Sequence, residues 1–261
     1  MRAAAVLVPW MLLAQVSTPP RLENQGKPIR VPATCSEEDM QALGLDCTET
    51  RPCPLYLELV AVESAGTRQF VSGNLHTTDT TLASILLATE DGGKTWYEPV
   101  PRIRGAGLDQ IQFYDLETGW IAGHALTTPP RDPFLLVTTD GGKNWRKRAI
   151  YPESRPGLIE AFWFESRTRG VMLLDRIQTG GEGGRYEMYE TMTGGETWSL
   201  REISREPLPV RRPGGGPESR SWRIQTDART KAFRIEKRTF DGWREIASFL
   251  VEVGACGVKE P

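Results

Sequence analysis

Histidine is scarce in this chain of 261 residues, which contains only His76 and His124. Two histidines so far apart cannot form a His-x-x-His metal motif, and no serine or cysteine lies in a nucleophile-elbow sequence. Nucleotide-binding glycine loops are also missing, because the glycine clusters at 180–184 and 214–216 precede no expected helix. We therefore expect no metal, no cofactor and no histidine-based catalytic set.

Long hydrophobic runs are absent beyond the N-terminus. No other stretch approaches the length of about 18 apolar residues that a membrane-spanning helix needs. Residues 3–14 are apolar but too short to cross a bilayer, and they follow Arg2. A charged start and a short apolar run are typical of a secretory signal. We interpret residues 1–17 as a signal peptide and expect an exported protein, periplasmic or extracellular, with no membrane span.

An excess of charge of one sign is missing as well. The chain has 32 basic and 34 acidic residues, for a formal net charge of −2. This balance argues against a general nucleic-acid or anionic-membrane binder. The basic residues nevertheless crowd the last third of the chain. That crowding fits either an ordinary solvated surface or a patch for an acidic partner or polysaccharide.

Cysteine is limited to Cys35, Cys47, Cys53 and Cys256. An even number in an exported chain predicts disulfides with three possible pairings, and the spacings are not those of a zinc ribbon or finger. We favour Cys35–Cys47, which would close the capped short helix that the sequence predicts over residues 36–44. The second bridge, Cys53–Cys256, would then tie the two ends of the chain together.

The most informative positive feature is a repeated octapeptide. Residues 89–96 read TEDGGKTW, and residues 138–145 read TTDGGKNW. A third copy at 191–198, TMTGGETW, has Thr193 in place of the aspartate, and a shortened fourth copy, TFDGW, lies at 239–243. The tryptophans recur about every 50 residues, a period typical of propeller blades and repeat arrays.

Each octapeptide has the chemistry of a β-hairpin turn. The aspartate can accept hydrogen bonds from the backbone amides ahead of it, and the paired glycines can take the positive φ of a tight turn. The tryptophan can start the next strand and pack across the turn. We expect these residues to be structural, and the oxygen-rich spacing of a calcium loop is absent. The turn-building residues are Asp91, Gly93, Trp96, Asp140, Gly142, Trp145, Gly195 and Trp198.

A second repeated element precedes each octapeptide and reads as strand, polar turn, strand. Residues 57–73, 108–123 and 158–173 follow this common plan, with apolar residues alternating in the first strand. A third strand leads into the octapeptide, and a fourth begins at its tryptophan. Four antiparallel strands per repeat is the composition of a propeller blade.

The octapeptide resembles the Asp-box, or BNR repeat, of sialidases, sortilin-type receptors and photosystem II assembly factors. The longer unit, of which FYDLETGWIAG at 113–123 is the clearest example, is most similar to the photosystem II stability and assembly factor family. The similarity covers residues 55–200 well and residues 205–253 poorly. It implies an all-β fold, a β-propeller whose four-stranded antiparallel blades carry Asp-box hairpins on the rim, but it does not transfer a function.

The chain has room for a propeller of four to five blades. We expect a signal peptide at 1–17, a cysteine-containing linker at 18–54, the propeller at 55–253, and a tail with Cys256 at 254–261. The four units fall at about 55–100, 101–150, 151–204 and 205–253. The last unit shows three clear strands, so the ring either closes by borrowing a strand from the other terminus or stays open.

The resemblance also raises the question of a sialidase-type active site. Sialidases use three arginines, a Tyr/Glu pair and an Asp, and their six-bladed propellers carry an Arg-Ile-Pro motif before the boxes. Here the nearest match, Arg102-Ile-Arg104, lacks the proline and follows the first box. We therefore expect a non-catalytic binding or assembly-factor-like module for an unknown protein or glycan partner. A glycan-directed hydrolase or lectin is the alternative.

The loops expected between the second and third strands, at 74–83, 124–133 and 177–185, are long for hairpins and contain both histidines. We predict that this face, with His76, His124 and Arg131 near its middle, meets the partner. The alternative is that these loops are tolerated insertions.

Overall fold

The structure is a computed structural model that describes residues 20–125, 131–176, 184–210 and 221–258, without the side chain of Arg131. Strands dominate these residues, and a short helix, α1 (Glu37–Leu43), precedes most of them. The all-β prediction is confirmed. No helix in the described part of the chain is long and apolar enough to cross a membrane. The predicted signal peptide lies outside the described residues.

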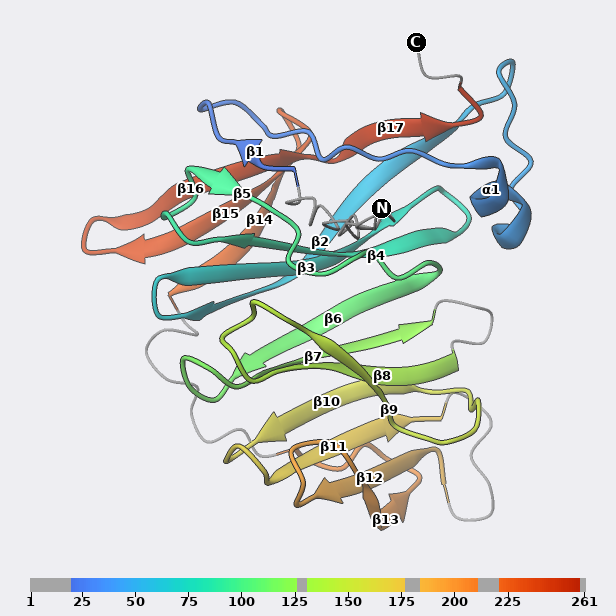
Figure 1. Cartoon of the computed structure of the whole chain (residues 1–261), viewed down its shortest axis with the longest axis vertical. Coiled ribbons are helices and arrows are strands. Elements are labelled where there is room, and N and C mark those ends of the chain that lie inside the picture. Colours follow the sequence, from blue (N-terminus) through green and yellow to red (C-terminus); the bar gives the residue numbers. More distant parts are fainter. Residues whose placement is uncertain (1–19, 126–130, 177–183, 211–220, 259–261) are drawn as a thin grey trace, which may run out of the picture.

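The strands form four antiparallel sheets, which we call blades 1 to 4 (Figure 1). Blade 1 consists of β2 (Cys53–Ala65), β3 (Arg68–His76), β4 (Thr81–Thr89) and, beside β2, β17 (Glu252–Cys256). Blade 2 consists of β6 (Ala106–Phe113), β7 (Gly119–Ala125), β8 (Arg131–Thr138) and β9 (Arg146–Ala149). Blade 3 consists of β10 (Leu158–Phe164), β11 (Gly170–Asp175), β12 (Tyr186–Thr191) and β13 (Ser199–Ser204).

Blade 4 has three strands, as the sequence predicted: β14 (Trp222–Asp227), β15 (Ala232–Thr239) and β16 (Gly242–Leu250). A separate two-stranded pair joins β1 (Leu22–Glu23) to β5 (Thr95–Trp96). Within blade 4, the shortened fourth octapeptide forms the tight turn between β15 and β16, where Thr239 pairs with Gly242.

Three apolar clusters join the blades face to face. The first joins blades 4 and 1 and includes part of the N-terminal segment. The second joins blades 1 and 2, where the ring of Phe70 stacks on that of Phe113 with 4.9 Å between centroids. The third joins blades 2 and 3, where Trp120 stacks on Phe164 at 3.7 Å. Because blade 1 is covered on both faces, β3 and β4 are buried along nearly their whole length.

The blades follow the order 4–1–2–3 along an open arc. No apolar cluster of the described residues joins blade 3 to blade 4, and Figure 1 shows these two blades toward opposite ends of the long axis. The sequence left two alternatives, a ring closed by a borrowed strand and an open ring. Between blades 3 and 4 the ring is open. The protein is a β-propeller with a gap between its third and fourth blades.

Both termini tie blade 4 to blade 1. The amide of Ile29 donates to the carbonyl of Ser248 (2.8 Å), and the amide of Leu250 donates to the carbonyl of Ile29 (2.9 Å). After β16 the chain continues into β17, which pairs with β2 in blade 1. Residues 254–256, which we expected in a tail, therefore belong to blade 1. A strand is borrowed from the C-terminus, but it extends blade 1 and leaves the ring open.

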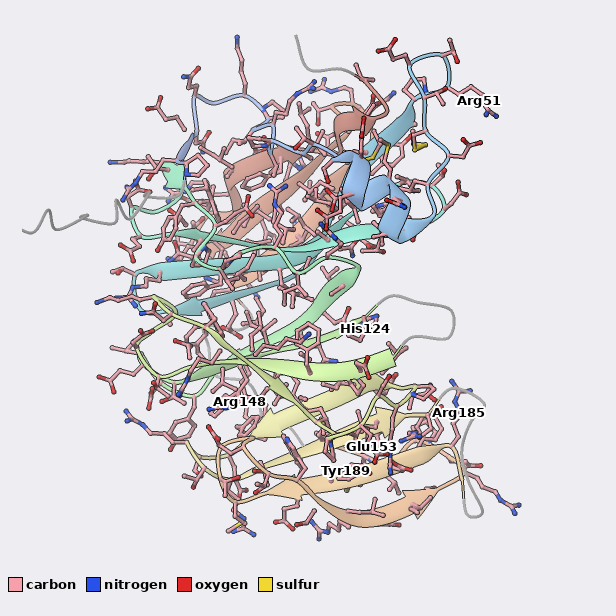
Figure 2. The ribbon with its side chains drawn as sticks, turned by 45° about the vertical axis from the view of Figure 1, so that its right-hand side comes forward. Arg51, His124, Arg148, Glu153, Arg185 and Tyr189 are labelled. Carbon is pink, nitrogen blue, oxygen red and sulfur yellow. A yellow bond between two sulfur atoms is a disulfide. The ribbon has the colours of Figure 1, made fainter. Side chains whose placement is uncertain are left out.

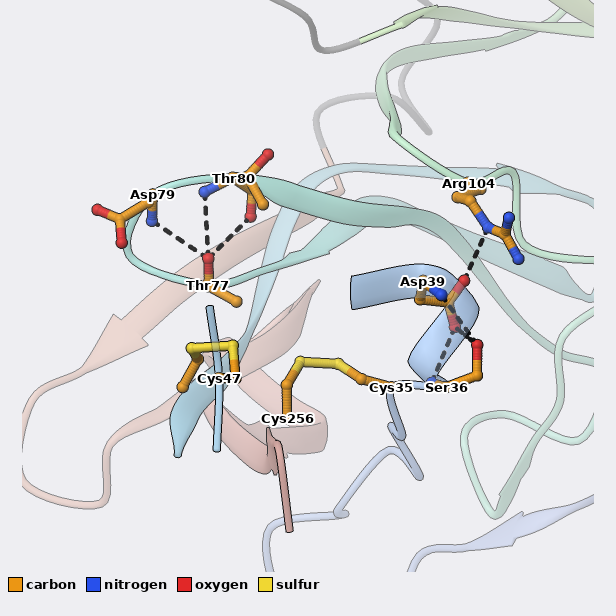
Figure 3. Close-up of a disulfide and its surroundings, with 10 residues drawn as sticks. Cys35, Ser36, Asp39, Cys47, Thr77, Asp79, Thr80, Arg104 and Cys256 are labelled. Carbon is orange, nitrogen blue, oxygen red and sulfur yellow. Dashed lines mark hydrogen bonds and ion pairs between the residues drawn. A yellow bond between two sulfur atoms is a disulfide. The ribbon is translucent and has the colours of Figure 1, made fainter. Parts of the chain in front are cut away.

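The disulfide pairing predicted from the sequence is wrong. Cys35 is bonded to Cys256, with 5.1 Å between Cα atoms, and Cys47 to Cys53, with 5.4 Å (Figure 3). The predicted helix is present, but it does not pair Cys35 with Cys47. Cys53 and Cys256 are register partners in the β2–β17 ladder, and each bonds to a cysteine of the N-terminal segment. The turn at 48–51, closed by two backbone hydrogen bonds, instead brings Cys47 back beside Cys53.

Candidate binding face

The first strands of blades 1, 2 and 3 share a β-bulge at the same place. The extra residues are Val60, Asp109 and Glu160. The bulges of blades 2 and 3 lie side by side, because Nε2 of Gln110 donates to the carbonyl oxygens of Ile159 (3.2 Å) and Glu160 (3.0 Å). A bulge turns its residue out of the regular alternation of a strand. Two carboxylates, on Asp109 and Glu160, are re-aimed in this way.

His124 is held by the bulge of blade 2. Its Nδ1 lies 2.7 Å from Oδ2 of Asp109, and the imidazole is buried. Figure 2 shows His124 on the same side of the molecule as Arg185 and Tyr189. The imidazole is therefore engaged within its own blade, at the end of the strands where the second-to-third loops begin.

A network of two tyrosines, a glutamate and an arginine joins blade 3 to the segment that enters it. The hydroxyls of Tyr151 and Tyr189 lie 3.0 and 2.8 Å from Oε2 of Glu187, and 3.1 Å from each other. Nη1 of Arg176 donates to the hydroxyl of Tyr151 (3.1 Å) and lies 3.5 Å from Oε2 of Glu187. All four side chains are buried or nearly so.

The environment keeps both phenols protonated. Burial raises the pKa of Tyr151, and the carboxylate of Glu187 acts in the same direction, against the opposing effects of Tyr189 and Arg176. Burial also raises the pKa of Tyr189, aided by its hydrogen bonds with Tyr151 and Glu187. Both hydroxyls remain donors at neutral pH. This is the opposite of what a phenolate nucleophile requires.

Two exposed arginines each lie against a tyrosine ring at this end of the strands. The guanidinium of Arg155 lies 4.9 Å from the centroid of the Tyr151 ring, within cation–π range. Arg185 forms a two-point ion pair with buried Asp175, and its guanidinium lies 5.3 Å from the ring of Tyr186. Its side chain is still 49% exposed. Both cations are thus held in place by the protein while remaining open to solvent.

The residues that the sequence singled out for binding are not gathered into one cluster. Nδ1 of His76 lies 2.7 Å from the carbonyl oxygen of Thr77, and its ring tilts against Tyr56. Among the described residues His76 and His124 have separate partners in separate blades. The backbone of Arg131 pairs with Ala125 at the start of β8, and its side chain lies outside the described part of the chain.

The prediction of a long loop at 74–83 is wrong. Strands β3 and β4 extend to His76 and from Thr81, which leaves only four residues between them. The hydroxyl of Thr77 accepts hydrogen bonds from the amides of Asp79 (3.2 Å) and Thr80 (3.1 Å) and closes a compact turn (Figure 3). The corresponding segments 126–130 and 177–183 lie outside the described residues.

The octapeptide turns lie at the other end of the strands. Oδ1 of Asp91 accepts from the amides of Lys94 (3.0 Å) and Thr95 (2.9 Å), and the indole of Trp96 donates to the carbonyl of Gly93 (3.2 Å). These bonds stay inside the turn. The second copy repeats them around Asp140, Gly142 and Trp145. In the third copy the amide of Gly195 bonds to the hydroxyl of Thr191, and Trp198 packs against the blade 2–3 cluster.

The sequence reasoning missed Tyr151, Glu187 and Tyr189. A usable signal was present, since Glu187 and Tyr189 stand two apart on one strand and therefore share a face of the sheet. Tyr151 offered no such signal, because it lies in the connection between blades. No group of three His, Cys, Asp or Glu side chains in the described residues could hold a metal ion.

Comparison with known proteins yields only distant similarities. No protein-family model and no curated protein matches the chain. A structure titled "YCF48 bound to D1 peptide" is 20% identical over 74% of this chain and 54% of that one, with a TM-score of 0.42. An alpha-L-arabinanase from Penicillium chrysogenum, complexed with arabinobiose, is 14% identical over 87% of this chain and 66% of that one, with a TM-score of 0.39. The chain thus spans about half of the first and about two thirds of the second.

Proposed function

We propose that this chain is an exported, non-catalytic β-propeller module that binds a protein partner at the loop end of blades 2 and 3. The observation that carries the proposal is the pair of exposed arginines at this end of the strands, Arg155 and Arg185, which lie within cation–π range of the rings of Tyr151 and Tyr186. Export is supported by the two disulfides, which persist in oxidising compartments.

Tyrosine and arginine are the residue types that dominate binding energy in protein interfaces. Free arginines lose rotamer entropy when they bind, and this cost is smaller where a side chain is already fixed. The ion pair with Asp175 fixes Arg185 before any partner arrives, and the ring of Tyr151 restricts Arg155. The face is therefore preorganised to receive acceptor groups such as backbone carbonyls and carboxylates.

The carboxylates beside these arginines support a binding role over catalysis. A glycosidase needs two carboxyl groups facing the scissile bond, one to donate a proton and one to act as nucleophile or base. Here Asp109 is paired with His124, Asp175 with Arg185, and Glu187 with two tyrosines. These three carboxylates are already engaged in interactions within the protein, whereas the bulged Glu160 is exposed to solvent.

The test is recovery of partners by the purified full chain from the native exported fraction, quantified by mass spectrometry. The R155A/R185A variant should recover a specific partner at least about tenfold less well than the wild type. The control is R51A, since Arg51 is exposed and lies away from this face (Figure 2). Equal recovery by wild type and R155A/R185A, with R51A unchanged, would eliminate this face as the binding site.

The Tyr151–Glu187–Tyr189 cluster favours one other candidate, a glycan-directed hydrolase or lectin, because it places a carboxylate against two phenols. Assay on a panel of fluorogenic glycosides addresses it directly. Turnover by the wild type that is abolished in E187Q, with an unchanged melting temperature, would establish the hydrolase and displace the binding module. Glycan binding without turnover would identify a lectin.

A further inference from the structure

Among the described residues, one face of blade 3 has no neighbouring blade. The side chains of Phe162, Met172 and Tyr189 pack toward blade 2. Trp163 and Val171 pair with each other across β10 and β11, and each is one position from a residue that faces blade 2. Because side chains alternate along a strand, Trp163 and Val171 lie on the opposite face. In blades 1 and 2 both faces are covered by other blades. The gap in the propeller therefore begins at this free face of blade 3.

The free face carries a pocket of about 540 Å³. Its floor is apolar and contains Trp163, Val171 and Met188. Segment 208–209 borders it on one side. We call this space the blade 3 pocket.

The rim of the blade 3 pocket is more acidic than basic. Its charged residues are three glutamates and two arginines: Glu165, Glu190, Glu202, Arg169 and Arg201. Arg169 is already engaged, because its guanidinium lies 3.0 Å from Glu165 and 3.6 Å from Glu190. The pocket therefore combines an apolar floor with a rim of net negative charge.

A protruding group of the opposite character lies in blade 4. Phe240, at the tip of the β15–β16 hairpin, is fully exposed. The turn is closed by a hydrogen bond from Oγ1 of Thr239 to the carbonyl of Gly242 (2.9 Å). We call Phe240 and its neighbours the hairpin knob. The sequence around Phe240 contains more exposed basic residues than exposed acidic ones. The basic residues are Lys237, Arg238 and Arg244, and the acidic residues are Asp241 and Glu245.

We propose that the hairpin knob of one copy of this chain docks in the blade 3 pocket of a second copy. A large exposed aromatic side chain meets an apolar floor of sufficient volume, and a basic flank meets an acidic rim. The knob belongs to blade 4 and the pocket to blade 3, and Figure 1 shows these blades apart with blades 1 and 2 between them, so the contact forms between copies. Such a contact is heterologous, joins copies head to tail, and covers the free face of blade 3.

The first experiment follows the self-association of the full, disulfide-intact chain by sedimentation velocity over a wide concentration range. The wild type should associate in a concentration-dependent manner, and F240S should weaken the association at least about tenfold. The control is V258S, which removes another exposed apolar side chain far from the knob in sequence. A wild type that stays monomeric, or an F240S variant that associates as the wild type does, would overturn the proposal.

The second experiment separates the two halves of the contact. V171D places a carboxylate in the pocket floor, and E202K reverses a charge on the exposed rim without touching the core. Each should weaken self-association, and E202K keeps the test informative if V171D does not fold. F240S keeps an intact pocket, and E202K and V171D each keep an intact knob. When F240S is mixed with E202K or V171D, the only intact contact is therefore the knob of the second variant in the pocket of F240S.

That mixture should form heterodimers and nothing larger, although each variant alone stays monomeric. A mixture that remains monomeric contradicts the proposal. A second outcome also contradicts the proposal: F240S loses binding to anionic phospholipid vesicles while its self-association stays the same. The knob would then be a membrane contact.

Discussion

At the scale of single residues, one side chain in each octapeptide turn accepts hydrogen bonds from backbone amides that have no carbonyl partner within the turn. Oδ1 of Asp91 accepts two amide hydrogen bonds, from Lys94 and Thr95. In the third turn Thr193 stands in the same place, and its hydroxyl accepts from the amide of Thr197 (2.9 Å). A hydroxyl offers one oxygen where the carboxylate offers two and a charge. The third turn is therefore the weakest of the three.

Restoring the aspartate in the third turn should stabilise the protein. T193D should raise the free energy of unfolding by about 1 kcal/mol, the usual effect of one added hydrogen bond or cap. The reciprocal change, D91T, should lower it by a similar amount. Urea unfolding of the two variants measures both effects. A T193D variant no more stable than the wild type would show that the carboxylate contributes nothing to these turns.

The same carboxylates predict a dependence of stability on pH. Burial acts to raise the pKa of Asp91, but hydrogen bonds from Thr95, Thr89 and Lys94 outweigh it and lower the pKa to about 2. The pKa of Asp140 is lowered in the same way, by Asn144, Thr138 and Lys143. A carboxyl group whose pKa falls on folding stabilises the native state at pH values above its unfolded pKa, about 4.

This stabilisation should be lost as the pH falls from about 4 through the folded pKa of Asp91, about 2. In D91N/D140N the corresponding loss should be absent, so the free energy of unfolding should depend less steeply on pH in that window. Urea unfolding from pH 6 down to pH 2 gives both curves. Parallel curves for wild type and variant would contradict the assignment.

At the scale of secondary-structure elements, the β-bulges of the inner strands depend on the residue opposite them. Gly73 and Gly123 pair with Leu59 and Leu108, immediately before the bulges of blades 1 and 2. A Cβ atom on Gly73 would collide with the carbonyl oxygen of Glu58. Glycine is needed here for close approach of two backbones and not for an unusual φ.

Gly73→Ala should therefore destabilise the protein strongly, by about 2–4 kcal/mol, because the colliding atom is backbone and cannot rotate away. The control is Gly157→Ala, whose added Cβ would lie 3.3 Å from the carbonyl oxygen of Asp175 and should cost clearly less. Chemical unfolding compares the two. Equal losses would mean that blade 1 can shift its strands apart at little cost.

At the scale of the whole molecule, the arc is closed at one end by covalent and strand contacts between its termini. The Cys35–Cys256 bond joins residues 221 apart in the sequence, whereas Cys47–Cys53 spans six. In the chain-entropy description, loops of these lengths stabilise by about 5 and about 2 kcal/mol. The long bridge holds β17 in blade 1, and through it blade 4.

C35S/C256S should accordingly lose more stability than C47S/C53S, and each pair also removes one cysteine buried in the core. Urea unfolding of the two double variants provides the comparison, and non-reducing peptide mapping of the wild type checks the pairing itself. Equal losses, or peptides that link Cys35 to Cys47, would contradict the structure.

Much of the architecture could be predicted from local chemistry. The strands leading into each octapeptide, the three strands of blade 4 and the capped helix before blade 1 all appear near their predicted positions. That a partner binds at the end of the strands that carries His124 stays a prediction. The tyrosine–glutamate network at this end could not be predicted, because Tyr151 reaches Glu187 only after blades 2 and 3 have packed. The loop at 74–83 was mispredicted because the hydroxyl of Thr77 caps a turn shorter than its composition indicates.

The sequence by itself determined the all-β fold, the repeat and the hairpin turns, since these depend on residues a few positions apart whose hydrogen bonds close locally. Only the tertiary structure decided the cysteine pairing, the place of β17 in blade 1, the open side of the arc and the tyrosine–glutamate–arginine network. Each of these joins residues from different blades or from opposite ends of the chain. Periodicity and turn chemistry carry no information about which distant strands meet, because that is decided by the packing of whole sheet faces.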